Sequence, residues 1–133
     1  MLEALEPAMR AGGRSLDVGS GTGYLTAALH KLGAPGGMSV GVEHMRELVD
    51  LSIKNIRAAG LGEAIDRDEL VICHGDGRLG HSEYGPFDAI HVGAASASLR
   101  ECGVLLQQLA EGGRMVVPVG PEHGEQQCLE LVL

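Results

Sequence analysis

The chain has 133 residues and a formal net charge of −8 at pH 7. That length is enough for one domain with a buried core. The acidic balance opposes nonspecific attraction to nucleic acid or to anionic membranes, because both are negatively charged. Aromatic residues make up only 2% of the chain, which disfavours a stacking platform for single-stranded bases. We therefore expect neither a nucleic-acid partner nor a membrane partner.

The cysteines and the apolar segments indicate a compartment. Cys73, Cys102 and Cys128 are odd in number, far apart and in no Cys-x-x-Cys pair, so we expect neither a disulfide framework nor a metal site. No apolar run is long enough to span a bilayer, and no charged-then-apolar leader opens the sequence. These features are typical of a soluble protein in a reducing compartment, and we expect a cytoplasmic one.

The first elements, taken in chain order, are a helix, a strand and a second helix. Apolar residues at helical spacing predict a helix over Leu2–Ala11. The short alternating run Arg14–Val18 predicts a strand, and the spacing after Gly23 predicts a helix from Tyr24 to Leu32. The loop Gly19-Ser20-Gly21-Thr22-Gly23 therefore lies at a strand-to-helix turn.

Glycine at such a turn lets a ligand approach the backbone without meeting a Cβ, and the N–H groups of the helix start favour negative charge. A dinucleotide fingerprint would need glycine at position 24, where Tyr24 stands. Instead an acid, Asp17, precedes the first glycine by two residues. Glycine-rich turns that bind nothing are also common, so the loop alone leaves both interpretations open.

The remaining chain continues the alternation of strands and helices. The predicted elements are a strand at Met38–Val42, a helix at Met45–Ala59 ended by Gly60, a connection at Leu61–Asp68, strands at Glu69–Cys73 and Phe87–Val92, a helix at Leu99–Leu109, and strands at Arg114–Val119 and Gln127–Leu133. Pro118 places the end of its strand near an edge or outside the ladder. This pattern predicts an α/β fold, a doubly wound, mostly parallel sheet with helices on both faces.

Acidic residues follow two of the predicted strands. Glu43 lies 20 residues after Gly23 (43 − 23), where a carboxylate can accept both hydroxyls of a ribose; it could equally be the N-cap or a first-turn acid of the next helix. Asp76, between Gly75 and Gly77, can accept a hydrogen bond from an adenine amino group or can form a plain Asx turn. Because the carboxyl ends of parallel strands share one edge, we expect the glycine loop, both acids and Gly93 to form one nucleoside site.

Several segments together resemble one enzyme family. They are Leu16–Gly23, Val42–His44, Gly75–Arg78, Phe87–Ala95 and Gly112–Gly120. They are similar to the protein-L-isoaspartate (D-aspartate) O-methyltransferases, which are class I S-adenosylmethionine-dependent methyltransferases with a Rossmann-like core. The resemblance implies transfer of a methyl group from S-adenosylmethionine to the α-carboxylate of L-isoaspartyl and D-aspartyl residues in damaged proteins, leaving S-adenosylhomocysteine.

The resemblance also assigns roles to residues. Asp17 and the loop residues Gly19, Ser20, Gly21 and Gly23 would bind the methionine portion of the cofactor. Glu43 with His44 would bind the ribose region, and Asp76 with Gly77 the adenine. Many family members carry Asp where Glu43 stands, and either carboxylate can bind a diol. The implied partners are isoaspartyl-containing proteins, with no metal and a monomeric or weakly dimeric state.

Two expectations concern catalysis. His91 lies among apolar strand residues, so we expect a packed, hydrogen-bonded histidine in preference to a catalytic base, with Gly93-Ala94-Ala95 making room for substrate. Family members also carry an upstream hydroxyl-bearing loop and a downstream segment, so we expect residues 1–133 to be one domain, incomplete at both ends, with catalytic groups in the missing loop. Such a chain could bind cofactor without turnover. The alternatives are methylation of a small molecule or RNA, and a catalytically silent S-adenosylmethionine-binding module.

Overall fold

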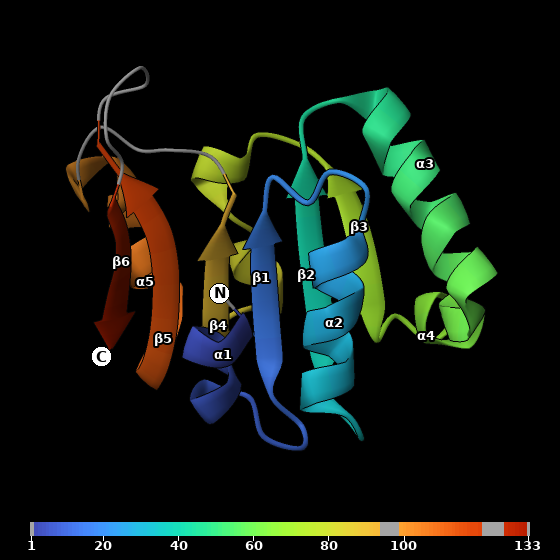
Figure 1. Ribbon diagram of the computed structural model, residues 1–133, viewed down its shortest axis with the longest axis horizontal. Coiled ribbons are helices and arrows are strands. Elements are labelled where there is room, and N and C mark those ends of the chain that lie inside the picture. The colour runs from blue at the N-terminus through green and yellow to red at the C-terminus, as the bar shows by residue number, and fades with distance from the viewer. Residues whose placement is uncertain (1, 94–98, 121–126, 133) are drawn as a thin grey trace.

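A computed structural model of the chain describes residues 2–93, 99–120 and 127–132. All the strands in these ranges belong to one six-stranded sheet with the order β3-β2-β1-β4-β5-β6 (Figure 1). The strands are β1 (Arg14–Val18), β2 (Met38–Glu43), β3 (Leu70–His74), β4 (Phe87–Val92), β5 (Leu109–Val119) and β6 (Gln127–Val132). The first five are parallel and β6 runs antiparallel to β5. The predicted mostly parallel, doubly wound sheet is confirmed.

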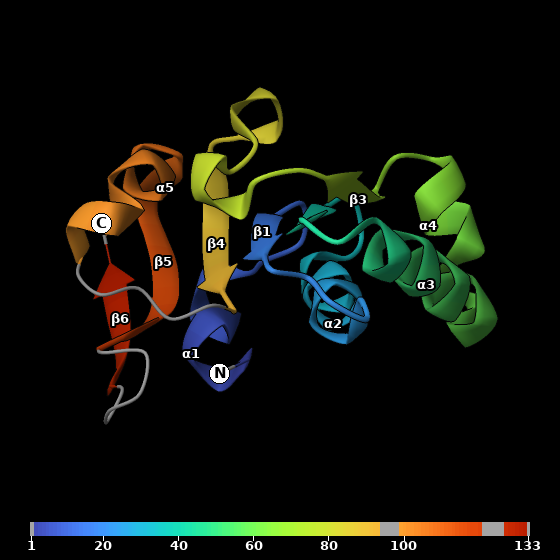
Figure 2. The ribbon, with the colours of Figure 1, turned by 90° about the horizontal axis from the view of Figure 1, so that it is seen from above.

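Helices cover both faces of this sheet (Figure 2). They are α1 (Leu2–Leu5), α2 (Tyr24–Gly33), α3 (Arg46–Ile56), α4 (Gly62–Asp66) and α5 (Gly103–Gln107), with 3₁₀ turns η1 (Glu6–Ala8), η3 (Gly77–Leu79), η4 (Ser82–Tyr84) and η5 (Leu99–Cys102). On one face, α1 and α2 pack through Leu5 and Leu29 onto Ala89 and Val116. On the other, α5 packs through Leu105 into the larger apolar cluster.

The order of the strands determines where a ligand can bind. The chain moves from β1 outward through β2 to β3, then returns to β4 on the other side of β1. The connections that follow β1 and β4 therefore leave in opposite directions, and in open α/β sheets ligands bind near such a reversal of strand order. The carboxyl ends of these strands lie along the upper edge of the sheet in Figure 1. The buried strand β1 thus carries the glycine loop to the middle of that edge.

The first predicted helix is helical only in its first part. The helix predicted over Leu2–Ala11 is wrong beyond its first turns, because α1 ends at Leu5, a 3₁₀ turn follows to Ala8, and Met9 is extended. Pro7 explains the break, since a proline has no N–H to donate and disfavours the α conformation in the residue before it. Leu5 and Met9 are nevertheless both buried, so the predicted apolar contact with the sheet is confirmed.

Three further boundaries differ from the prediction. Helix α3 ends at Ile56, before the predicted Ala59, and a π-helical turn η2 (Arg57–Leu61) follows, in which Gly60 has a φ of +88°. The segment beyond it, predicted as a connection, contains α4, whose Ala64 is buried. The predicted helix at Leu99–Leu109 is split into η5 and α5. Strand β5 begins already at Leu109, which pairs with Phe87, and a register shift accommodates the glycines before Arg114.

Pro118 lies beyond the point where β5 is paired with β4, so its missing N–H costs no hydrogen bond to that strand. The parallel pairing of β5 with β4 ends at His91 and Val116, and Pro118 is paired only with Cys128 of β6. It therefore lies outside the ladder with β4, as expected. Within the described ranges, no helix combines the length and the apolar character that crossing a membrane requires.

Candidate functional site

The glycine loop has the left-handed backbone that its composition predicts. Gly19, Gly21 and Gly23 have φ angles of +77°, +54° and +87°. A Cβ on Gly23 would lie 2.9 Å from Ser52 Cβ on α3, whereas a Cβ on Gly21 would meet nothing within 4 Å. Gly23 therefore serves the packing of α2 against α3, and Gly21 leaves open space beside the loop.

Glu43 ties this loop to the end of β2. Its side chain is buried, with 4% of the residue exposed. One carboxylate oxygen accepts a hydrogen bond from Gly21 N–H at 3.1 Å, and the other accepts from Met45 N–H at 2.8 Å and lies 3.1 Å from His44 Nδ1. The bond to Met45 supports the residue before α3, but the N-cap of that helix is Met45 and its first-turn acid is Glu47, so Glu43 is neither the N-cap nor the first-turn acid of the alternative interpretation. A carboxylate has about four acceptor sites, which leaves capacity for a further donor.

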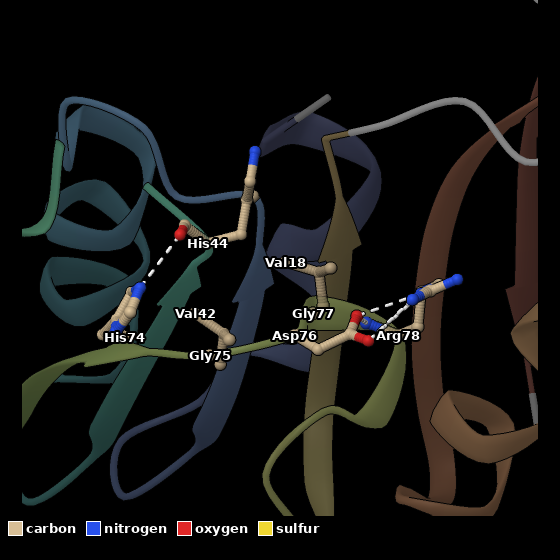
Figure 3. Close-up of a pocket in the computed structure, with 9 residues that line it drawn as sticks. Val18, Val42, His44, His74, Gly75, Asp76, Gly77 and Arg78 are labelled. Carbon is tan, nitrogen blue, oxygen red and sulfur yellow. Dashed lines mark hydrogen bonds and ion pairs between the residues drawn. The ribbon is translucent and has the colours of Figure 1, made fainter. Parts of the chain in front are cut away.

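A cavity of about 640 Å³ opens at the carboxyl ends of β1, β2 and β3 (Figure 3), and Glu43 lies between two of its lining residues, Val42 and His44, without lining it. Its lining consists of Val18, Gly19, Val42, His44, His74, Gly75, Asp76, Gly77 and Arg78. The two histidines lie at one side of it, where His74 Nε2 is 2.9 Å from the His44 carbonyl oxygen. The cavity therefore joins segments from three strand ends that the sequence separates by tens of residues.

The floor of this cavity depends on a close approach between two segments. A Cβ on Gly77 would lie 2.5 Å from Val18 Cγ1, which no side chain can occupy without displacement. At Gly75 a Cβ would lie 3.7 Å from Val42 Cγ1, an ordinary contact. Gly77 is thus required by packing between β1 and η3, in a position where it also borders the cavity.

Asp76 faces the cavity with its carboxylate held by Arg78 (Figure 3). Arg78 donates through Nε to Oδ1 at 3.0 Å, through Nη2 to Oδ2 at 2.9 Å, and through its backbone N–H to Oδ1 at 3.0 Å. The backbone bond is the Asx turn that the sequence left as an alternative. These bonds hold the pKa of Asp76 below its ordinary value, because they stabilise the ionised form.

Asp17 does not line the cavity. Only 1% of it is exposed, Thr26 Oγ1 donates to its Oδ2 at 2.7 Å, and His91 Nδ1 lies 2.9 Å from its Oδ1. Its position follows from strand alternation, since Val18 faces the cavity and the preceding side chain must point to the opposite side. The expectation that His91 is packed and hydrogen-bonded is confirmed.

The other predicted residues occupy different positions. His44 lines the cavity with a side chain that is 78% exposed. Ser20 is buried beside Gly41 of β2, and its Oγ has no partner among the described residues. Ala94 and Ala95, expected to make room for substrate, lie outside the described residues. Gly93 is exposed, and its N–H donates to the Val18 carbonyl at 2.7 Å.

Sequence reasoning missed several lining residues. Val18 and Val42 are the last or next-to-last residues of their strands, so their place at the rim could have been read from the same alternation. Arg78 carried a weaker signal, because an exposed arginine two residues after an acid is common on protein surfaces. Its bonds to Asp76 are visible only in the structure.

The fold and the site together define a class of protein. A 3-2-1-4-5 parallel order, a glycine loop after β1, an acid at the end of β2 that bonds this loop, and an acid after β3 that lines the cavity are the arrangement of the class I S-adenosylmethionine-dependent methyltransferases. The family model described as protein-L-isoaspartate(D-aspartate) O-methyltransferase matches residues 1–132. The chain belongs to this family.

Individual relatives agree with that assignment. A Caenorhabditis elegans protein-L-isoaspartate O-methyltransferase is 45% identical over 130 residues, covering 98% of this chain and 56% of the relative. Protein-L-isoaspartate O-methyltransferase 1 of Arabidopsis thaliana is 48% identical over 119 residues, covering 90% and 51%. A solved Plasmodium falciparum structure, described as a protein of the same family in complex with S-adenosyl-L-homocysteine, has a TM-score of 0.86 and 32% identity, covering 98% and 62%. The chain thus spans about half the length of these curated relatives.

Proposed function

We propose that this chain is the S-adenosylmethionine-binding part of an enzyme that methylates the α-carboxylate of L-isoaspartyl and D-aspartyl residues in damaged proteins. The observation that carries the proposal is the convergence of the glycine loop, Glu43 and Asp76 on one edge of the sheet. Membership of the family supplies the substrate class. Residues 1–133 would form a single domain, because the described strands all belong to one sheet.

The described residues suit S-adenosylmethionine. A cavity of about 640 Å³ falls within the roughly 300–1,000 Å³ typical of small-molecule sites. In this proposal Asp76 would accept from the adenine amino group, and Glu43 with His44 would bind the ribose hydroxyls. The methionine carboxylate would meet the open side of Gly21 and the N–H groups of the first turn of α2, which have no intrahelical acceptor.

S-adenosylmethionine supplies an electrophilic methyl group on a sulfonium sulfur. The acceptor is a carboxylate, which is already ionised at pH 7, so the reaction does not need a strong general base. What the protein must provide is alignment of the acceptor oxygen with the methyl carbon and exclusion of water. The residues of this chain would anchor the cofactor for that alignment, and the further length of the relatives is where we place the acceptor-binding groups.

The same proposal covers partners and location. Isoaspartyl-containing proteins would be the macromolecular substrates, and the absence of any Cys-x-x-Cys pair suits a reducing, cytoplasmic location. A monomeric or weakly dimeric state stays a prediction.

The test is a methyl-transfer assay with labelled S-adenosylmethionine on an isoaspartyl peptide and on its aspartyl twin of the same sequence. We expect the full-length product to methylate the isoaspartyl peptide and to leave the twin unmodified. Cofactor binding without transfer to either peptide by the full-length product would instead support a silent binding module. Transfer to RNA or to a small molecule alone would replace the proposed substrate.

A further inference from the structure

Arg78 holds the cavity acid Asp76 at three points. Its Nε donates to Oδ1 at 3.0 Å, its Nη2 donates to Oδ2 at 2.9 Å, and its backbone N–H donates to Oδ1 at 3.0 Å. A single contact between exposed charges fixes little, whereas a guanidinium fork on both oxygens fixes the plane of a carboxylate. Both residues line the cavity, so the orientation of its acid depends on Arg78.

The bonds from Arg78 limit where Asp76 can accept another hydrogen bond. A carboxylate has about four acceptor positions, shared between its two oxygens. Oδ1 accepts from both the Nε and the backbone N–H of Arg78, whereas Oδ2 accepts from Nη2 and lies 3.3 Å from Nε. The acceptor capacity that Arg78 leaves free is therefore on Oδ2.

Arg78 also closes one side of this carboxylate. In Figure 3 its guanidinium approaches Asp76 from the side away from His44 and His74. The Asp76 side chain is 42% exposed, and the cavity reaches from it to the two histidines. A ligand group that bonds Oδ2 therefore comes from the histidine side of the cavity.

The charge of Asp76 determines which ligand group fits at that point. The side-chain and backbone hydrogen bonds from Arg78 hold the pKa of Asp76 below its ordinary value, and an ionised carboxylate can only accept. An N–H group of a ligand would complete a hydrogen bond there. A carbonyl oxygen would face a negative charge with no proton between the two oxygens.

We propose that Arg78 is a positioning residue that sets the base specificity of the cavity. By clamping Asp76, it makes the cavity select a purine with an exocyclic amino group over one with an oxo group at the same position. This inference rests on the proposed function, which places adenine beside Asp76. The contact between Asp76 and the amino group belongs to that function, and the inference adds the clamp, through which Arg78 acts without touching the ligand.

The experiment compares two ligands by calorimetric titration. They are S-adenosylhomocysteine and S-inosylhomocysteine, which carries an oxo group in place of the 6-amino group. We expect the wild-type chain to prefer S-adenosylhomocysteine about a hundredfold, because a site built to accept from an N–H rejects the analogue that lacks it. Arg78→Met removes the clamp and should lower the preference to about tenfold, mainly through weaker binding of S-adenosylhomocysteine.

Two further variants separate the clamp from charge alone. Arg78→Lys retains the charge without the planar fork, so we expect it to recover only part of the preference. Arg57→Met is the matched control, because Arg57 Nη2 lies 2.9 Å from Asp66 Oδ1 in an exposed ion pair and Arg57 does not line the cavity. The control should leave both affinities unchanged. A purely structural role of Arg78 would weaken both ligands equally and leave their ratio as it is in the wild type.

A second readout needs no variant. In the wild-type chain, the Nε–H proton of Arg78, followed by ¹⁵N–¹H NMR, should stay protected from exchange with water when S-adenosylhomocysteine is added. Faster exchange in the complex would mean that the ligand displaces Arg78 and would overturn the clamp. Equal preferences in the wild type and Arg78→Met would also overturn it, and both results leave the proposed function standing. Failure of the folded wild-type chain to bind S-adenosylhomocysteine would overturn the proposed function and the inference together.

Discussion

Glu43→Gln is the substitution whose effect follows most directly from the geometry. The two carboxylate oxygens accept from Gly21 N–H at 3.1 Å and Met45 N–H at 2.8 Å. A glutamine amide has one oxygen and one NH₂ group, so either orientation places NH₂ against one of these N–H donors. One backbone donor at a site that is 4% exposed then loses its acceptor, at a cost of about 1–3 kcal/mol. We expect Glu43→Gln to lower the free energy of unfolding by about 2 kcal/mol.

Urea unfolding measures this loss, and titration with S-adenosylhomocysteine measures its consequence for the loop. Glu47→Gln is the matched control, because Glu47 is an exposed acid in the first turn of α3 and its charge there contributes at most about 1 kcal/mol. We expect Glu43→Gln to weaken cofactor binding at least tenfold, about 1.4 kcal/mol, while the control binds normally. If Glu43→Gln and Glu47→Gln unfolded at the same urea concentration, the buried acceptor role of Glu43 would be refuted.

Three further contacts are tested by substitution. Gly77→Ala places a Cβ 2.5 Å from Val18 Cγ1 and should destabilise the fold by about 1–3 kcal/mol in urea, whereas Gly75→Ala, with 3.7 Å to Val42 Cγ1, should be nearly neutral; equal effects would contradict the close approach. Thr26→Val removes the donor at 2.7 Å from Asp17 and should cost about 1.5–3 kcal/mol, with Thr26→Ser recovering most of it; an unchanged stability would count against that bond. Arg78→Met should raise the pKa of Asp76 towards its ordinary value, since Arg78 is what lowers it. The folded-state pKa of Asp76 is depressed, so the Asp76–Arg78 bonds contribute to the stability of the fold at pH values above the ordinary carboxyl range. That contribution is lost as the pH falls through the lowered pKa. A carboxyl ¹³C titration of Asp76 with the same midpoint in both proteins would contradict this cause.

The common edge of the site was predictable because parallel strands present their carboxyl ends together. The glycine loop after Val18, Glu43 and Asp76 each follow an apolar run, and the alternation of elements indicated that these runs are parallel neighbours. No atomic detail was needed for that inference. It succeeded because sheet topology, more than any individual contact, decides which loops meet.

The contacts of individual side chains were less accessible from sequence. The sequence predicts that Asp17 binds the cofactor, and that role stays a prediction; what the sequence does not show is that its side chain is buried and bonds Thr26 and His91. Strand alternation relative to Val18 would have indicated this direction, but not the partner on β4, which depends on the register between strands distant in sequence. The bonds from Arg78 to Asp76 depend in the same way on local turn geometry.

The predicted boundaries of helices and strands are wrong where the apolar spacing competes with another local residue or with strand pairing. Pro7 broke a helix that the apolar spacing favoured. The helical spacing of the apolar residues predicts that Leu109 ends a helix, but Leu109 pairs with Phe87 and is the first residue of β5. Such pairing is decided by the neighbouring strand, which a pattern along one segment does not contain.

The central claim is that Asp76, Glu43 and the glycine loop form one cofactor site, and one titration tests it most directly. S-adenosylhomocysteine is titrated into the folded 133-residue chain and into Asp76→Ala, with Asp50→Ala on the exposed face of α3 as the control. We predict binding at one site per chain, weakened at least tenfold, or about 1.4 kcal/mol, by Asp76→Ala and unaffected by Asp50→Ala. No binding to the folded wild-type chain, or equal affinities for all three proteins, would contradict the site.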